Sequence, residues 1–201
     1  MVGFDHLLAT ALNENIHKNL GPKTTAKIAD RLFEKFGLSL TQSIEEFEKF
    51  DLVLREFFGR GADDLEQKMF KDIIEIKSKK SKGNWQKITN PNIARIILEA
   101  VGDQEKKKIL ETTADTPKIV ADIVKDVSIP QTSGYRKINS LINGGLLVQS
   151  GYIMKDNKKI SKYVCIFDNL KINIEKEKVI VDIQLTQQEQ QNSSILEIIQ
   201  T

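Results

Sequence analysis

The chain has 201 residues, of which 40% are hydrophobic and 29% are charged, and its formal net charge is +2 at pH 7. This composition is ordinary for a globular protein and contains no apolar run long enough for a membrane span, so we expect none. The single cysteine, Cys165, excludes an internal disulfide and a cluster of thiolate metal ligands, and the N-terminal sequence lacks a signal peptide, so we expect a cytoplasmic location.

The charge is distributed unevenly along the sequence. Residues 1–74 contain 10 Lys and Arg against 13 Asp and Glu, residues 75–174 contain 18 against 10, and residues 175–201 contain 2 against 5. A basic middle of this kind favours a polyanionic partner such as nucleic acid. Solvated faces on which charges pair with one another would also give these totals, so both explanations remain open.

Apolar residues recur at helical spacing in four segments of residues 1–76, which predicts a helical bundle. Gly21-Pro22 is expected to end the first helix and to begin the second. Ser43 and Glu46 have the spacing of a capping box, and Asp63 is expected to cap the fourth helix. Five of the nine phenylalanines lie between positions 33 and 57, which predicts a bundle core and leaves open a pocket for an unknown effector.

Residues 77–87, KSKKSKGNWQK, contain five lysines and no aliphatic residue, which predicts an exposed basic linker over 77–90. The lysines leave open a contact with a phosphate backbone. Trp85 either anchors this linker on a neighbouring domain or contacts a partner.

The helical pattern begins again after the linker, with Asn90-Pro91 at the start of one helix, Asp103 as the cap of the next and Pro117 near the start of a third. From residue 146 onwards the segments are short and rich in β-branched and aromatic residues, as is typical of strands. The expected fold class is therefore mainly α with a small β part. Three helices followed by a basic hairpin give a winged helix-turn-helix domain over 91–185, and 186–201 form a Gln-rich tail with a short C-terminal helix.

The segment SIPQTSGYRKINSLINGGLL, residues 128–147, has its polar groups first and its apolar groups behind them. A recognition helix inserts its N-terminal half into the major groove, so side chains that contact DNA must come early. We therefore predict a recognition helix at about 130–143 that ends at Gly144-Gly145. Its expected DNA contacts are Gln131, Thr132, Ser133, Tyr135, Arg136 and Lys137. An amphipathic helix with a merely solvated polar face is the alternative.

The segment YIMKDNKKISKY supplies the predicted wing at about 153–162. Asp156-Asn157 is a plausible turn pair, and Lys155, Lys158 and Lys159 surround it. We expect these lysines to contact the DNA backbone or the minor groove. The alternative is a solubilising hairpin whose charges protect a sheet edge.

The recognition-helix segment, together with AVGDQEKKKILETTADTPKIVADIV, resembles ArsR-like winged-helix regulators, particularly archaeal ones. The resemblance covers roughly 91–185 and implies a homodimeric repressor or activator that binds double-stranded DNA. Metal sensing does not carry over, because the paired cysteines that it needs are absent, and Gly134 replaces the usual small aliphatic residue. More weakly, LNENI, IADRLFEKFG and LREFFG resemble a small helical output domain of ammonia-oxidising archaea, which implies a dimerisation or signal-receiving role for 1–76.

No residue pattern indicates an enzyme, a metal site or a cofactor. His6 and His17 lie three helical turns apart, about 16 Å, which is too far for one metal ion. No serine or cysteine has a neighbouring base, and GRGADD lacks the third glycine of a nucleotide-binding loop. Two further hypotheses stay open beside a DNA-binding regulator: a winged-helix adaptor that binds protein within a transcription or other assembly, and an RNA-binding regulator.

Overall fold

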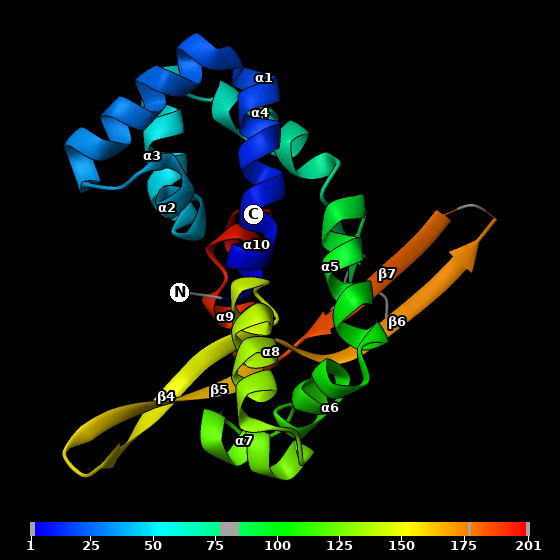
Figure 1. Cartoon of the computed structure of the whole chain (residues 1–201). Helices are drawn as coiled ribbons and strands as arrows, with labels where there is room; N and C mark the ends of the chain where they lie inside the picture. The colour runs from blue at the N-terminus through cyan, green and yellow to red at the C-terminus, as the bar shows by residue number, and fades with distance from the viewer. Residues whose placement is uncertain (1–2, 77–84, 177, 200–201) are drawn as a thin grey trace.

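The computed structural model describes residues 3–76, 85–176 and 178–199, and most of them are helical (Figure 1). The helices are α1 (Gly3–Phe36), α2 (Leu40–Glu45), α3 (Phe47–Phe58), α4 (Gly61–Lys71), α5 (Pro91–Gly102), α6 (Gln104–Thr112), α7 (Val120–Val127), α8 (Gln131–Asn143), α9 (Gln187–Asn192) and α10 (Ser194–Ile199). The strands are β1 (Ile74–Ile76), β2 (Trp85–Ile88), β3 (Lys118–Ile119), β4 (Leu147–Lys155), β5 (Lys158–Cys165), β6 (Phe167–Glu175) and β7 (Lys178–Leu185). The prediction of a mainly α chain with a small β part is confirmed.

The first helix changes direction where the sequence predicted a break. Gly21 has φ 73° and ψ 163°, a conformation that is not helical, and Pro22, which has no backbone N–H to donate, follows it. The two halves of α1 therefore run at an angle to each other, with α2 and α3 beneath the second half (Figure 1).

Two capping predictions in this region are wrong. The capping box belongs to Ser39 and Gln42 at the start of α2, and α3 begins at Phe47 without a side-chain cap. Asp63 lies inside the first turn of α4, after Arg60 at the N-cap. Two possible N-cap patterns, one beginning at Ser39 and one at Ser43, overlap in the sequence. The pattern at Ser39 is the one that forms, and it leaves Ser43 and Ile44 buried within α2.

The strands form two antiparallel sheets. The order of the first is β1-β2-β7-β6, and that of the second is β3-β5-β4. Each sheet contributes one long hairpin, β6–β7 or β4–β5, and the two hairpins project from the body in different directions (Figure 1). The expected helix start at Pro117 is wrong, because strand β3 precedes the helix. Ile119 is extended, at φ −75° and ψ 154°, and lies opposite Lys162 of β5, so α7 begins only at Val120.

Strand β2 lies within the segment that the sequence assigned to a linker. Its residues pair with β7, with Trp85 opposite Gln184 and Ile88 opposite Val181. The Nζ atom of Lys171, on β6, lies 4.0 Å from the centroid of the Trp85 ring. Trp85 is thus anchored on the sheet, while the predicted linker residues 77–84 lie outside the described part of the chain.

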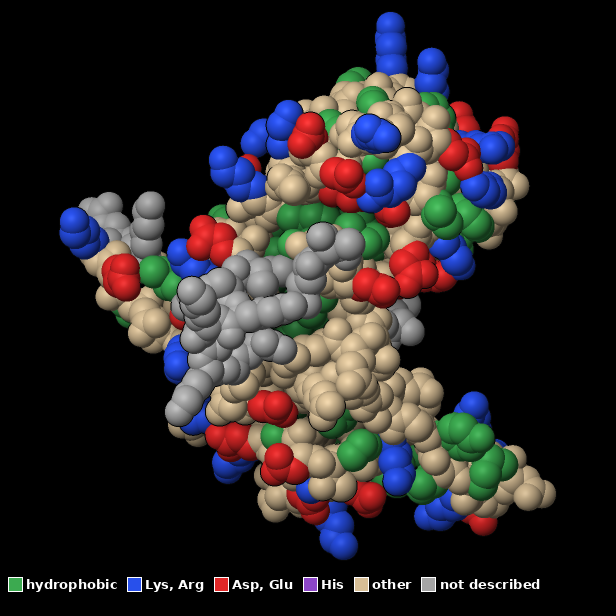
Figure 2. Space-filling model, turned by 180° about the vertical axis from the view of Figure 1, so that it is seen from behind, with side chains coloured by type: hydrophobic (Ala, Val, Ile, Leu, Met, Phe, Trp, Pro, Cys, Tyr) green, Lys and Arg blue, Asp and Glu red, His purple; other side chains and the backbone are tan. Residues whose placement is uncertain are grey.

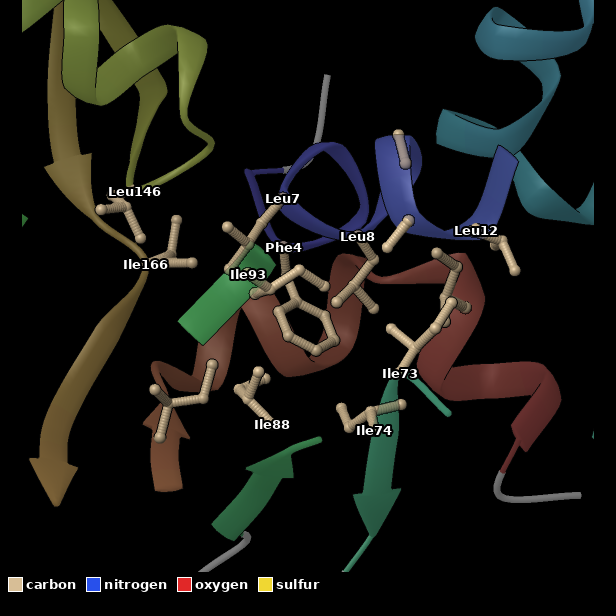
Figure 3. Close-up of a cluster of buried hydrophobic side chains, with 14 of the residues drawn as sticks. Phe4, Leu7, Leu8, Leu12, Ile73, Ile74, Ile88, Ile93, Leu146 and Ile166 are labelled. Atoms are coloured by element: carbon tan, nitrogen blue, oxygen red, sulfur yellow. The ribbon is translucent and has the colours of Figure 1, made fainter. Parts of the chain in front are cut away.

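The first turn of α1 packs against the C-terminal helices. The backbone N–H of Phe4 donates to Glu189 Oε2 at 3.0 Å, and the backbone N–H of Ser194 donates to Asp5 Oδ2 at 3.0 Å. Figure 3 shows Phe4 together with side chains from β1, β2, α5 and the β5–β6 connection in one apolar cluster. The predicted C-terminal helix therefore docks within its own chain, with Ile195 and Leu196 buried.

Candidate nucleic-acid interface

Helix α8 begins directly after Pro130 and presents three different faces. Gly134, Ile138 and Leu141 are buried on the inner face. The backbone N–H of Gly134 donates to the oxygen of Pro130 at 2.9 Å, which closes the first turn. The exposed face carries side chains predicted to contact DNA, namely Gln131, Thr132, Tyr135 and Arg136.

Gly134 permits the close contact between α8 and α7. A Cβ atom added at this position would lie 2.6 Å from Cγ2 of Val124 and 3.2 Å from two side-chain atoms of Ile129. Val124 is a buried residue of α7, so it has little freedom to retreat. Gly134 is therefore a packing requirement of this helix pair.

The third face of α8 turns toward the start of α6. The Nζ atom of Lys137 forms an ion pair with Asp103 and lies 3.3 Å from Glu105 Oε2. The lysine side chain is only 16% exposed. The hydrogen bond from Lys137 lowers the pKa of the Asp103 carboxyl and raises that of the lysine. Ser133 Oγ lies 3.5 Å from Glu105 Oε2 on the same side. The structure therefore places Ser133 and Lys137 in an intramolecular network and leaves the other four predicted residues on the open face.

The predicted wing is the β4–β5 hairpin, and Asp156-Asn157 form its turn. Both residues have left-handed φ values, 50° and 57°, and Lys155 pairs directly with Lys158 across the two-residue turn. Asn and Asp tolerate this conformation better than other non-glycine residues do, which is why the hairpin closes here. Lys155, Lys158 and Lys159 are all exposed around the turn.

The hairpin also carries apolar side chains that sequence reasoning missed. Tyr152 is 52% exposed and Met154 is 63% exposed. Lys159 is opposite Met154, and its Nζ atom lies 3.9 Å from the centroid of the Tyr152 ring. A two-residue turn fixes the register of a hairpin. A turn at Asp156-Asn157 therefore predicts that Met154 lies opposite Lys159, so this cluster could have been predicted from the sequence.

Figure 1 shows the N-terminal end of α8, next to α7, toward the lower end of the molecule. The tip of the β4–β5 hairpin lies toward the same end, away from α2, α3 and α4. At its other end α8 stops as predicted, where the Gly144 N–H donates to the Ser140 oxygen at 3.0 Å. His6 contacts this end: its Nε2 atom lies 2.9 Å from the Asn143 backbone oxygen, a link that sequence reasoning also missed.

The N-terminal phenylalanines divide between core and surface. Phe47 and Phe50 are fully buried, and their ring centroids are 5.2 Å apart. Phe33 and Phe57 are exposed, so the aromatic cluster is only partly a bundle core. A hollow of about 1010 Å³ lies beside α4 and α10, with Arg55, Glu66 and Ile198 among the residues that line it.

In residues 3–76, 85–176 and 178–199, no group of three His, Cys, Asp or Glu side chains could hold a metal ion. Within those same residues, no helix combines the length and the hydropathy that crossing a membrane requires. Cys165 is buried, and burial raises its thiol pKa to about 12.

Comparisons of the chain with protein-family models, with curated proteins and with solved structures find no match.

Proposed function

We propose that this chain is a sequence-specific DNA-binding transcriptional regulator, located in the cytoplasm and acting as a homodimer, whose residues 91–185 include a winged helix-turn-helix domain. The order of elements supports this assignment. Helices α5 and α6 precede the short strand β3, α7 and α8 follow, and β4 and β5 complete a sheet of order β3-β5-β4. In this arrangement α8 is the recognition helix and the β4–β5 hairpin is the wing.

The observation that carries the proposal is the exposed polar face at the start of α8. Gln131, Thr132, Tyr135 and Arg136 come from its first two turns, while the apolar side chains behind them hold the helix on the body. Arg136 forms no ion pair among the described residues, so its guanidinium is available to a ligand. Arg pairs well with guanine O6 and N7, and Gln with adenine N6 and N7, so this face suits the major groove.

The wing supplies charge rather than sequence information. Lys155, Lys158 and Lys159 lie at the tip of a hairpin that closes with a two-residue turn, where they would contact phosphates or the minor groove beside the site read by α8. In a homodimer the two recognition helices would contact half-sites separated by about 34 Å, one turn of B-DNA.

A gel-shift titration against genomic fragments, with unrelated duplex as competitor, tests the proposal. We expect Arg136→Ala to weaken specific binding by about 1–3 kcal/mol, and Arg136→Lys to retain the charge but lose base selectivity. Arg60→Ala is the matched control, because Arg60 is exposed at the N-cap of α4, a helix that lies away from the N-terminal end of α8 (Figure 1). Equal affinity of the Arg136→Ala variant and the control for the preferred fragment would contradict the proposal.

A protein-binding adaptor is the second candidate, and the exposed Tyr152 and Met154 favour it. Apolar side chains of this size on a hairpin are typical of a protein interface. Salt separates the two functions, since the logarithm of a DNA affinity falls linearly with the logarithm of salt concentration and an apolar protein interface changes little. Competition between duplex DNA and RNA separates the remaining, RNA-binding, hypothesis.

A further inference from the structure

The β6–β7 hairpin, which we call the arm, projects from the body with an uncovered apolar face. Near the body this face is buried, at Val181 and Ile183. Toward the tip it becomes exposed: Ile172 is 40% exposed, Val179 is 42% exposed and Ile174 is 76% exposed. Ile174 pairs directly with Val179, and Ile172 with Val181, so these side chains share one face of the hairpin.

The outer edge of the arm is also open. Strand β6 ends the order β1-β2-β7-β6, so among the described residues β7 is its only strand neighbour. β6 has nine residues, from Phe167 to Glu175, and an exposed edge of this length with apolar side chains is a template for pairing with another strand. Beyond Val181, where the pairing of β7 with β2 ends, the described part of the arm is two-stranded, and a two-stranded hairpin in water is only marginally stable without further contacts.

The sequence of β6 is self-complementary about Asn173. Ile172 and Ile174 lie one residue to each side of it, and Lys171 and Glu175 lie two residues to each side. In an antiparallel pair of identical strands centred on Asn173, Ile172 is opposite the partner's Ile174 and Lys171 is opposite the partner's Glu175. In this register apolar side chains of one strand therefore contact apolar side chains of the other, and each lysine lies opposite a glutamate.

Other registers lack this match. If the register between the two β6 strands shifted by one residue, the apolar side chains of one strand would lie on the same sheet face as the polar side chains of the other. Centres at Lys171 or Glu175 would place like charges directly opposite each other, and a centre at Ile172 would leave Lys171 opposite the partner's Asn173. Only the centre at Asn173 joins the two apolar faces and forms two ion pairs at once.

We propose that the arm is the dimerisation element and that β6 pairs antiparallel with β6 of a second copy about a two-fold axis at Asn173. Such an interface is isologous, because both copies contribute the same strand, and it extends two four-stranded sheets into one of eight strands. The four isoleucines from positions 172 and 174 of both copies then lie side by side on one face of the joined sheet and contact one another. The inference deepens the homodimer element of the proposed function and rests on it.

The position of the arm agrees with this role. It points away from α8 and from the β4–β5 hairpin, so pairing along β6 leaves the proposed DNA-contacting face uncovered (Figure 1). From the opposite side, Figure 2 shows the arm standing clear of the body, with basic, acidic and hydrophobic side chains near its end.

Sedimentation equilibrium of the full chain without DNA is the first test. We expect a dimer for the wild type and at least a tenfold weaker association for Ile174→Asp. Met154→Asp is the matched control, because Met154 is similarly exposed on the other hairpin and its substitution should leave the dimer intact. A monomeric wild type, or a dimer that Ile174→Asp does not weaken, overturns the proposal, and capture of a different chain by β6 does so as well.

Charge exchange tests the register. Lys171→Glu alone and Glu175→Lys alone should each weaken the dimer, because each opposes two like charges in both halves of the interface. The double variant restores opposite charges across the interface and should associate more tightly than either single variant, although within each chain it still loses the Lys171 contact with Trp85 and places a carboxylate opposite Asp182. A double variant no tighter than either single variant contradicts the pairing of these two positions.

Cross-linking gives a readout that does not depend on stability. The two Asn173→Cys residues would lie directly opposite each other, within reach of a disulfide, so oxidation should yield a covalent dimer. The native Cys165 is buried and does not compete. Asn157→Cys, at the turn of the other hairpin, is the control, and equal cross-linking of both variants overturns the two-fold centre.

These measurements separate this inference from the proposed function. If the arm variants are monomeric and still bind a single half-site through Arg136, both ideas stand. If Ile174→Asp stays dimeric and binds DNA, the arm inference alone fails. If the dimer depends on the arm and no duplex is bound, the DNA-binding proposal alone fails.

Discussion

His6 and Asn143 join the first turn of the chain to the last residue of the proposed recognition helix. The Nε2 atom of His6 lies 2.9 Å from the Asn143 backbone oxygen, while its Nδ1 atom lies 2.7 Å from Glu45 Oε1. Both ring nitrogens of His6 thus have an oxygen within hydrogen-bond distance. One side chain thus links α1, α2 and α8.

Replacing His6 should loosen this three-helix contact. We expect His6→Leu to lower the free energy of unfolding by about 1–3 kcal/mol, because it removes the side chain that contacts both the Asn143 backbone oxygen and the largely buried Glu45 carboxylate. Urea denaturation at pH 7 measures the change. His17→Leu, on an exposed position of the same helix, should change stability by less than about 0.5 kcal/mol, and equal effects at the two positions would contradict the role of His6.

Lys137 should affect stability more than DNA binding. Its ammonium is held by Asp103 and Glu105, so Lys137→Ala is expected to lower the free energy of unfolding by about 0.5–1 kcal/mol. DNA affinity should fall less than twofold, whereas Arg136→Ala on the open face should reduce it strongly. Thermal denaturation and fluorescence anisotropy on the same two variants give the comparison. A Lys137→Ala protein of normal stability that no longer binds DNA would show that the ion pair opens on binding.

Gly134 should not tolerate a side chain. Gly134→Ala places a methyl group against Val124 and should cost about 1–3 kcal/mol of stability, even though alanine is the better helix former. Gly102→Ala is the control, because nothing lies within 4 Å of a Cβ atom there. Chemical denaturation of both variants decides the matter, and a stabilised Gly134→Ala protein would mean that α7 and α8 can separate.

The wing lysines should control the salt dependence of DNA binding. Replacing Lys155, Lys158 and Lys159 together by alanine should reduce the slope of log affinity against log salt by up to about 2.7, or 0.9 for each lost phosphate contact. Anisotropy titrations over a range of salt concentrations measure the slope. Alanine at the exposed Lys18, Lys23 and Lys27 of α1 removes the same charge from the opposite end of the molecule and should leave the slope unchanged.

Glu66 should make the protein less stable at alkaline pH. Burial, and next the neighbouring Asp51, raise its pKa to about 8, and its Oε1 atom has no hydrogen-bond partner among the described residues. The folded protein thus keeps a proton that the unfolded chain releases near pH 4.5, so this stability is fully present below pH 4.5 and is lost as the pH rises through 8.

The variant Glu66→Gln removes this titration. Its melting temperature should exceed that of the wild type by several degrees at pH 8.5 and should differ little from it at pH 5. Glu14→Gln, on an exposed face of α1, should follow the wild type at both pH values. A difference between Glu66→Gln and the wild type that is the same at pH 5 and pH 8.5 would contradict the raised pKa.

Local signals in the sequence were sufficient for several parts of the structure. Asn90 and Asp103 cap α5 and α6 as predicted, because their oxygens reach backbone N–H groups only two and three residues away. Asp156-Asn157 close the predicted hairpin for a similarly local reason. The exposed face of α8 followed from its helical period once the position of the helix was known.

The parts that sequence reasoning missed depend on distant partners. Lys137 meets Asp103 across 34 positions, and nothing in the α8 sequence distinguishes a paired lysine from a free one. Strand β2 forms because β7, about a hundred residues later, offers it an edge, whereas its own sequence reads as a linker. The contact of His6 with α8 spans 137 positions, so no local sequence pattern predicts it either.

Gly145 connects α8 to the N-terminal helices without any intervening side chain. A Cβ atom there would lie 2.6 Å from the backbone nitrogen of Leu7 and 2.7 Å from the backbone oxygen of Gly3, so main chain rests on main chain. Packed backbone resists compression, so a displacement of the first turns of α1 toward this contact must also move the junction of α8 and β4. The C-terminal end of the helix proposed to contact DNA is therefore seated directly on the backbone of the first turns of α1.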